Sequence, residues 1–262
     1  MNVASGRTPA RLVLDAAGLE KAVAGLDVDV LAVQEVDAGQ PRSRHVDQAA
    51  ALAAGLGAAE WRGAATVAGT PDPFRSWSPT GPGLRGPHAP GDGPLYGIAL
   101  LSRLPVLEWS VLDLGAGRAR LPVQGPDPRT GRVRWWWFPD EPRAAVAARL
   151  DALTVVATHL SFAPGFNVAQ LARLVRAVRD LPGPVVLLGD LNMPGPVPAA
   201  VLPRWRSLAR EATFPAVVPR IQFDHALVRD GADRPLPAVA AVETVLTPIS
   251  DHRALVVDLR TG

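Results

Sequence analysis

The sequence predicts an α/β fold in which two β-sheets pack face to face and helices cover their outer sides. Two apolar runs that are typical of buried strands, 30–33 and 185–188, are each followed closely by a carboxylate, Glu35 and Asp190. A segment with helical periodicity precedes each run. Such an internal echo is expected when two similar α/β halves bury their sheets against each other. The length of 262 residues is sufficient for a single domain, 1–262.

The first half of the chain is predicted to contain two helices, two strands and a long loop. Residues 11–25 and 46–56 have the apolar spacing of helices. One strand ends at Glu35, and a short buried strand covers 98–101. Residues 68–97 are dense in proline and glycine, so we expect a long loop there.

The second half is predicted to contain a strand pair, a helix, two further strands and a second loop. The strands are expected at 143–150, 153–158, 185–188 and 254–257, and an amphipathic helix at 167–180. The second loop extends from about residue 115 to residue 140. Its first twenty residues contain one acid, Asp127, and the arginines Arg118, Arg120, Arg129, Arg132 and Arg134. Phosphate steering and a solvated loop explain this cluster equally well.

Bulk composition excludes several kinds of site. The chain has no cysteine, which excludes disulfides, thiolate zinc sites and a cysteine nucleophile. With 48% hydrophobic and 20% charged residues it has the composition of a globular protein, and a net charge of +2 gives only weak support for nucleic-acid binding. We find no apolar run long enough for a membrane span and no signal-peptide pattern, so a cytoplasmic protein is expected.

Polar side chains gather where the predicted strands end or begin. Glu35, Asp190 and Asn192 follow apolar runs, while Asp251 and His252 come directly before the last one. Strand ends place side chains at the rim of a sheet, where binding and catalytic groups usually lie. Asp190 and Asn192 alternate along one extended segment, so both can face the same side. Several carboxylates and a histidine at such rims suggest a hard-cation site that performs hydrolysis.

Seven short segments resemble, in order, the endonuclease/exonuclease/phosphatase superfamily. They are Leu-Ala-Val-Gln-Glu-Val-Asp at 31–37, Gly-Ile-Ala-Leu-Leu-Ser-Arg at 97–103, Glu-Pro-Arg at 141–143, Thr-His-Leu at 158–160, Gly-Asp-Leu-Asn at 189–192, Asp-His at 224–225 and Ser-Asp-His at 250–252. One segment would be weak evidence, but seven in order are strong because independent coincidences multiply. The resemblance implies a four-layer α/β sandwich of two mixed sheets flanked by helices. It also implies hydrolysis of a phosphate ester by in-line attack of water, with Mg²⁺ or alternatively Mn²⁺.

The resemblance further implies a metal site composed of Glu35, Asp251 and Asn2. Glu35 is the main ligand, because Mg²⁺ takes few protein oxygens and retains water. Asn2 matches the metal-site asparagine of the family, which ends the family's first buried strand. Only Met1 precedes it here. We therefore expect that first strand to be missing, through a misassigned start or a truncated chain.

Asp190 and Asn192 receive catalytic roles from the resemblance. Asp190 would orient or deprotonate the attacking water, and Asn192 would donate to a non-bridging phosphate oxygen. His252 and Asp224 would form a pair in which the carboxylate fixes the imidazole tautomer. The general base is left open among the members of this His/Asp group.

His159 is implied to donate to the phosphate or to the leaving oxygen, with Glu141 as the acid that orients it. His225 is assigned to packing beside the site. The run Trp135–Phe138 is interpreted mainly as strand packing. Other aromatic residues considered for substrate contact are Tyr96, Trp77 and Phe74.

The favoured function is that of a metal-dependent phosphodiesterase acting on DNA or RNA. This choice is based on the loop arginines and on His159. The alternative is a phosphomonoesterase or phosphodiesterase that acts on a small molecule such as an inositol phosphate or a lipid head group. The lipid substrate is disfavoured because no exposed hydrophobic hairpin is evident. Two further alternatives are an inactive binding protein that retains the fold and a structural scaffold. We expect a monomer with no protein partner.

Overall fold

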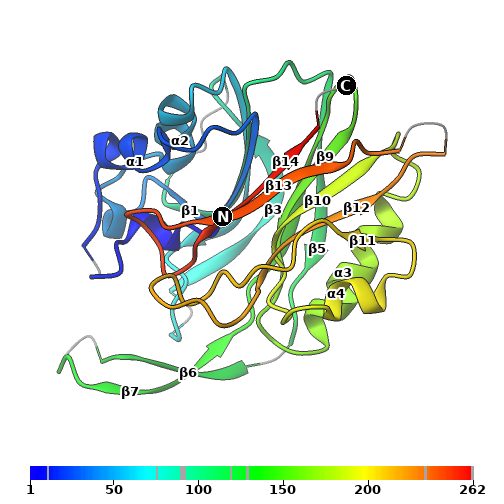
Figure 1. Ribbon diagram of the computed structural model, residues 1–262. Coiled ribbons are helices and arrows are strands. Elements are labelled where there is room, and N and C mark those ends of the chain that lie inside the picture. Colours follow the sequence, from blue (N-terminus) through cyan, green and yellow to red (C-terminus); the bar gives the residue numbers. More distant parts are fainter. Residues whose placement is uncertain are drawn as a thin grey trace.

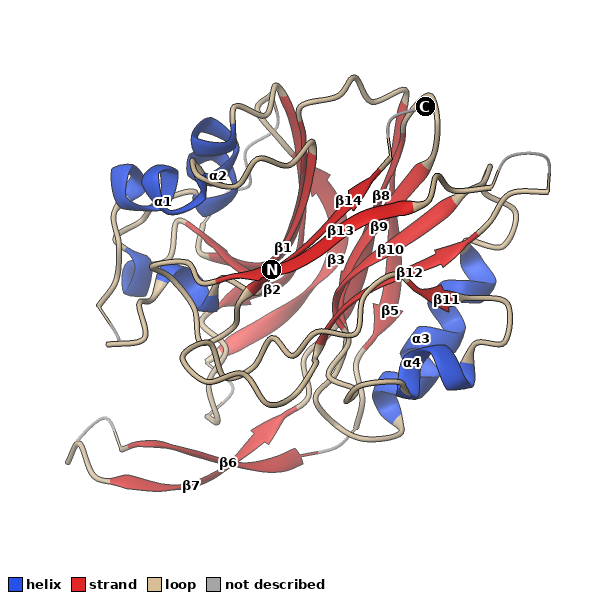
Figure 2. Cartoon of the chain, viewed as in Figure 1, coloured by secondary structure: helices blue, strands red, loops and turns tan. Residues whose placement is uncertain are grey.

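The protein is represented by a computed structural model, which describes residues 1–10, 12–74, 76–88, 93–118, 120–127, 130–232 and 235–260. Two sheets pack face to face, with α1 and α2 on one outer side and α3 and α4 on the other (Figure 2). The predicted α/β sandwich with outer helices is confirmed. Within the described ranges, no helix is long and apolar enough to cross a membrane.

The first sheet has four strands in the order β1-β4-β2-β3. Their bounds are Val30–Ala38 for β1, Glu60–Gly69 for β2, Trp77–Arg85 for β3 and Leu95–Ser102 for β4. All three pairings between them are antiparallel. The four strands therefore do not form the mixed sheet that was expected. The helices α1 (Ala16–Val23) and α2 (Gln48–Leu56) cover its outer face through a core that contains Leu19, Val33 and Leu52.

The second sheet has six strands in the order β11-β12-β10-β9-β8-β5. Their bounds are Glu108–Gly115 for β5, Arg143–Arg149 for β8, Thr154–His159 for β9, Val185–Asp190 for β10, Arg206–Ser207 for β11 and Asp224–Arg229 for β12. This sheet is mixed, because β9 and β10 are parallel. The helix α3 (Phe166–Ala177) connects these two strands and, with α4 (Val197–Val201), covers the outer face.

Side chains from the two sheets meet in a central core of small and branched residues. It includes Ala32 and Leu100 from the first sheet and Val146, Val155 and Ala157 from the second. Small side chains let the two sheets approach closely. The strand ends that carry the predicted polar residues are thereby brought to a common rim.

Both predicted long loops contain strands. Residues 68–97 include β3, an edge strand that tolerates Pro79 and Pro82 because one side of an edge needs no ladder hydrogen bonds. Residues 115–140 include a two-stranded ribbon of β6 (Arg120–Pro126) and β7 (Val133–Pro139). Proline and glycine in these segments therefore did not prevent pairing outside the sheet interiors.

The first predicted helix begins later than its periodicity suggested. The helix α1 starts at Ala16, where the side chain of Asp15 accepts a hydrogen bond from the Gly18 N–H and caps the end. Arg11, part of the predicted helix, lies outside the described residues, as does Arg129 of the second loop. The last strand, β14 (Ala254–Leu259), pairs with β13 (Val239–Val245) in a separate two-stranded sheet.

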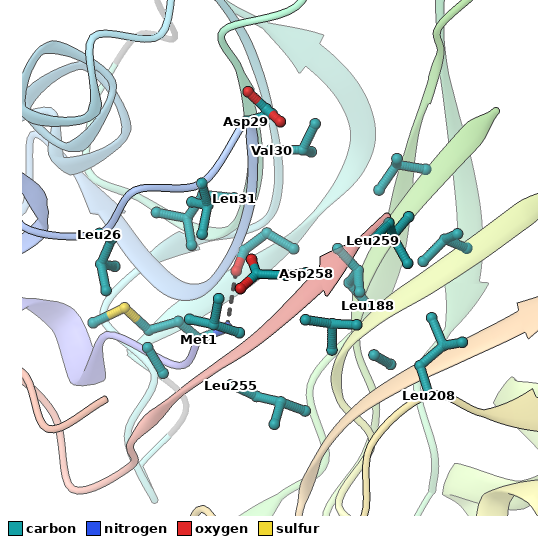
Figure 3. Close-up of a pocket in the computed structure, with 18 of the residues that line it drawn as sticks. Met1, Leu26, Asp29, Val30, Leu31, Leu188, Leu208, Leu255, Asp258 and Leu259 are labelled. Carbon is teal, nitrogen blue, oxygen red and sulfur yellow. Dashed lines mark hydrogen bonds between the residues drawn. The ribbon is translucent and has the colours of Figure 1, made fainter. Parts of the chain in front are cut away.

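An apolar cavity of about 400 Å³ lies between β1 and β14 (Figure 3). Leu31, Leu188 and Leu255 line it, and Met1 lies at one end. The amino group of Met1 donates to the carbonyl of Ala32 at 2.9 Å, and burial lowers the pKa of that amino group. The cavity adjoins β1, the outermost strand of its sheet. The missing first strand stays a prediction.

Candidate active site

Seven of the predicted polar side chains come together at one rim of the sandwich. We call them the polar cluster: Asn2, Glu35, His159, Asp190, Asn192, Asp224 and His252. They come from β1, β9, β10 and β12, from the chain start and from the turn before β14. Residues distant in sequence therefore meet because the two sheets end at the same edge.

Asp190 lies at the centre of this cluster and is 2% exposed. The preceding Gly189 permits this position, because a Cβ there would lie 2.0 Å from the carbonyl oxygen of Thr158 on β9. The backbone N–H of Asn192 donates to Asp190 Oδ1 at 3.0 Å. Burial raises the pKa of Asp190, and the charge of Asp224 raises it further, to about 7. Near neutral pH this carboxyl can therefore take up or release a proton.

His252 and Asp224 form the expected pair. His252 Nδ1 lies 2.7 Å from Asp224 Oδ2, and the ring packs against Phe214 and Phe223 with centroids 5.0 and 6.5 Å away. Burial alone would lower the pKa of His252, but the hydrogen bond and charge of Asp224 outweigh it and raise the pKa to about 9. Burial would raise the pKa of Asp224, yet the contact with His252 lowers it. His252 is therefore cationic at neutral pH.

His159 has the opposite electrostatic environment. Arg143 Nη1 lies 2.9 Å from His159 Nδ1, and because a guanidinium can only donate, Nδ1 accepts. Burial lowers the pKa of His159 well below its usual value, and the charges of Arg143 and His252 lower it further. The ring is therefore neutral, with its proton on Nε2, which lies 3.8 Å from Asp190 Oδ2.

Arg143, rather than Glu141, orients His159. The carboxylate of Glu141 contacts Arg143 at 3.6 Å, so it acts on the imidazole only through that guanidinium. Burial raises the pKa of Glu141, although Arg143 opposes the shift. We had not placed Arg143 in the site, although it belongs to the Glu-Pro-Arg segment and could have been found there. Tyr96 is buried nearby, and burial followed by the charge of Glu35 raises its pKa well above the usual value.

Asn192 is held in place through its side chain and its backbone. Its amide nitrogen donates to the carbonyl of Leu160 at 3.0 Å. The same nitrogen lies 3.2 Å from His159 Nε2, which carries a proton in this tautomer and therefore does not accept from it. Asn167 on α3 donates to the backbone carbonyl of Asn192 at 2.9 Å. The positioning role of Asn167 was missed, since a helical asparagine carries no distinctive sequence signal. His225 is not part of the cluster; its Nε2 donates a hydrogen bond to the carbonyl of Met193 at 2.8 Å, a structural contact beside the site.

Asn2 joins the two carboxylates at the edge of the cluster. It is 2% exposed, and its amide nitrogen donates to Glu35 Oε1 at 2.8 Å and to Asp190 Oδ2 at 3.3 Å. A bulge in β1 and a positive φ of 59° turn Glu35 toward it. Residues 1–3 pair with β1 around Gln34, so Asn2 is fixed and not at a frayed end.

The predicted metal ligands are only partly brought together. The oxygens of Glu35 and Asp190 suit Mg²⁺, which takes one or two carboxylates and keeps several waters. Asn2 presents its nitrogen to them, because its Oδ1 accepts from the Ala4 N–H at 2.9 Å. Asp251 is exposed. In the part of the chain that the structure describes, no three His, Asp or Glu side chains form a metal-binding group. The carboxylate pair thus fits a cation better than the trio predicted from the sequence.

Comparisons with known proteins place the fold of the whole chain. Residues 1–252 match the model of the endonuclease/exonuclease/phosphatase family. A protein of this family from Beutenbergia cavernae has a similar structure, with a TM-score of 0.64 and 21% identity over 100% of this chain and 70% of that one.

Two further solved structures are also similar. D. rerio TDP2, in complex with a single-strand DNA product, has a TM-score of 0.57 and 13% identity over 97% of this chain and 96% of that one. A mannosyl-6-phosphatase from Bacteroides thetaiotaomicron has a TM-score of 0.53 and 14% identity over 94% and 90%. At these identities the likeness concerns the fold. No curated protein matched the sequence.

Proposed function

The chain belongs to the endonuclease/exonuclease/phosphatase family, whose members are phosphoric ester hydrolases, and we propose that this enzyme hydrolyses phosphodiester bonds of nucleic acids. One observation carries the proposal. Asp190 Oδ2 lies 3.8 Å from Nε2 of His159 and 3.9 Å from Nε2 of His252. A carboxyl, a neutral imidazole and a cationic imidazole therefore face a common point.

Asp190 is the general base of this proposal. Its pKa of about 7 is close to neutral pH, where a base has a useful ionised fraction and enough proton affinity to accept a proton. It removes a proton from the attacking water while the water oxygen bonds to phosphorus and the bond to the leaving oxygen breaks. His252, with a pKa of about 9, is already protonated and is less suited to this task. Among the members of the His/Asp group, these pKa values therefore support Asp190 as the proposed base.

His252, His159 and Asn192 would stabilise the phosphate. Asp224 accepts from Nδ1 of His252, which leaves the Nε2–H free to donate to a non-bridging oxygen. His159 offers an uncharged N–H at Nε2. Donors held rigidly in a dry site stabilise developing charge without reorganisation.

A divalent cation completes the proposed chemistry. Enzymes of this family generally depend on divalent metals. Glu35 would hold Mg²⁺, which would neutralise phosphate charge, and Asp190 would remain free to act as the base. Asn2 would serve mainly to position the Glu35 carboxylate, because its amide nitrogen faces that group.

Nucleic acid is the favoured substrate for two reasons. The structurally similar TDP2 is in complex with a single-strand DNA product. In addition, exposed arginines line the β6–β7 ribbon, which leads into the site. The similar mannosyl-6-phosphatase favours a second candidate, hydrolysis of a sugar phosphate monoester.

Nicking of supercoiled plasmid by the purified protein in Mg²⁺ tests the proposal. We expect nicking that EDTA abolishes and that His252→Ala reduces by about a hundredfold or more. His88→Ala is the matched control, because His88 is exposed and has no contact in the described structure with the polar cluster.

Bis(p-nitrophenyl) phosphate and mannose 6-phosphate should be assayed in parallel. Hydrolysis of the diester together with nicking supports a nucleic-acid phosphodiesterase. Hydrolysis of the monoester alone would contradict it and favour the second candidate.

A further inference from the structure

The β6–β7 ribbon projects from the sandwich as an arm. Its seven residue pairs run from Arg120 opposite Pro139 to Pro126 opposite Val133, and no other described strand pairs with either edge. In the view of Figure 1 it extends away from the two sheets at the lower left. An isolated ribbon of this length is marginally stable in water unless something packs on it.

One face of the arm carries exposed aromatic side chains. Trp135 and Trp137 point to the same side, since strand residues two apart share a face. They are 61% and 62% exposed, and Val133 on the same side is 66% exposed. Large apolar side chains gathered on one exposed surface indicate a docking site. This finding also corrects the expectation that the chain has no exposed hydrophobic hairpin and that the tryptophans serve strand packing.

The opposite face, by contrast, is occupied by contacts within the protein. The ring of Trp136 meets Phe74 edge-on with centroids 5.0 Å apart, and its indole N–H donates to the carbonyl of Gly125 at 3.2 Å. The guanidinium of Arg134 lies 4.3 Å above the same ring. These contacts orient the ribbon, so that Trp135 and Trp137 are presented to solvent on the other side.

The charge of the arm favours a polyanion. Arg118, Arg120 and Arg132 are exposed, while Asp127 accepts from Arg134 at 3.1 Å. Arginines beside stacking aromatic rings are the combination that holds single-stranded nucleic acid, since every base offers a face and every linkage a charge.

The base of the arm is fixed beside the polar cluster. After β7 ends at Pro139, Asp140 accepts from the Gly117 N–H at 2.6 Å and from the Ser161 hydroxyl at 2.7 Å. Glu141 and Arg143 follow at once and contact the site. Trp137 is four residues from Glu141, a span of about 14 Å at most. A strand bound along the arm would therefore reach the reacting phosphate within a few nucleotides.

The distribution of residues on the arm distinguishes nucleic acid from a membrane. The described tip residues, Asp127 and Thr130 to Arg132, include no large apolar side chain, and the tryptophans lie midway along one face. A hairpin that enters a bilayer needs apolar residues at its tip, whereas aromatic side chains along one face suit an extended polymer.

We propose that this face of the β6–β7 ribbon is a stacking platform for single-stranded nucleic acid. Trp135 and Trp137 stack on bases, and Arg120, which pairs with Pro139 on the same face, binds phosphate, which delivers the strand to Asp190. The inference rests on the proposed nucleic-acid function.

Fluorescence anisotropy with a labelled oligothymidine of about 12 nucleotides tests the platform in EDTA, without turnover. The test variant is Trp135→Ala with Trp137→Ala. The control is Leu104→Ala with Leu107→Ala, which removes two exposed side chains, 41% and 55% exposed, from the β4–β5 connection. We expect the tryptophan variant to bind about tenfold more weakly or worse, and the control to bind like the parent. Hydrolysis of bis(p-nitrophenyl) phosphate should be unchanged in both, which also shows that both are folded.

The other outcomes overturn the proposal in distinguishable ways. Equal oligonucleotide binding by the parent and the tryptophan variant removes the platform but leaves the phosphodiesterase intact. If the parent hydrolyses the diester but does not bind the oligonucleotide, the platform is likewise removed and the phosphodiesterase is left intact. The face would be assigned to a membrane by a different pair of results. The parent would not bind the oligonucleotide but would sediment with phosphatidylcholine/phosphatidylserine vesicles, and the tryptophan variant would not sediment with them. Absence of diester hydrolysis by the parent protein would instead contradict the proposed function.

Discussion

The polar cluster and the apolar cavity lie side by side, and the first two residues of the sequence contribute one side chain to each region. The side chain of Asn2 donates to Glu35 and Asp190, whereas Met1 lines the cavity beside β1. The cavity is lined mainly by leucine and other apolar side chains, which offer few groups for chemistry. The cluster contains several groups with shifted pKa values. The candidate site is therefore indicated by its polar contacts and shifted pKa values and not by the apolar cavity beside it.

The largest expected difference between the two regions is the effect of removing a carboxylate. Asp190→Asn should lower diester hydrolysis by about a hundredfold to ten-thousandfold, because the base is lost. Stability at pH 8 should not fall, since burial disfavours the charge of Asp190 and an amide oxygen can still accept from Asn192. Asp258→Asn, at the exposed edge of the cavity, is the matched control and should leave the rate unchanged. Hydrolysis rates and thermal unfolding measure both quantities. Full activity of Asp190→Asn would refute the assignment of the base.

The cluster should also make stability depend on pH. The pKa of His252 is raised from 6.5 to about 9, so its stabilisation is complete below pH 6.5 and is lost as pH rises through about 9. A shift of this size corresponds to about 3 kcal/mol in the free energy of unfolding. Urea titrations in EDTA between pH 6 and 10 measure it. The raised pKa of Asp190 adds a separate decrease between about pH 4 and 7. His252→Asn should flatten the alkaline part of the curve, and an unchanged slope in that variant would contradict the prediction.

The smallest expected effect comes from filling the cavity. A six-residue extension before Met1 with alternating valine and threonine should replace the buried amino group by a peptide N–H and place apolar side chains against Leu31 and Leu255. We expect stability to increase by about 1–2 kcal/mol, or several degrees in Tm, with hydrolysis unchanged. A glycine/serine extension of equal length is the control. Equal Tm values for both extensions would show that the cavity does not accept a strand.

The strands and helices of the sandwich were largely predictable, whereas the two ribbon-forming segments were not. The paired strands β8 and β9 and the helix α3 follow from periodicity, because burial on one face imposes a regular spacing. The strand β3 and the β6–β7 ribbon were mistaken for loops. Their proline and glycine are compatible with edge and isolated pairing, which the local sequence does not distinguish from a loop.

The sequence by itself determined which chemistry-bearing residues stand at strand ends, including Asp190, Asn192 and His252, since Gly189 and the apolar runs fix where each strand stops. Only the tertiary structure decided how these groups are charged. Whether an imidazole is cationic depends on its neighbours and on burial, and Asp224 and Arg143 reach the two histidines from distant strands or loops. Desolvation and hydrogen bonding are properties of the packed assembly, so they follow from the arrangement of both sheets and not from any local segment.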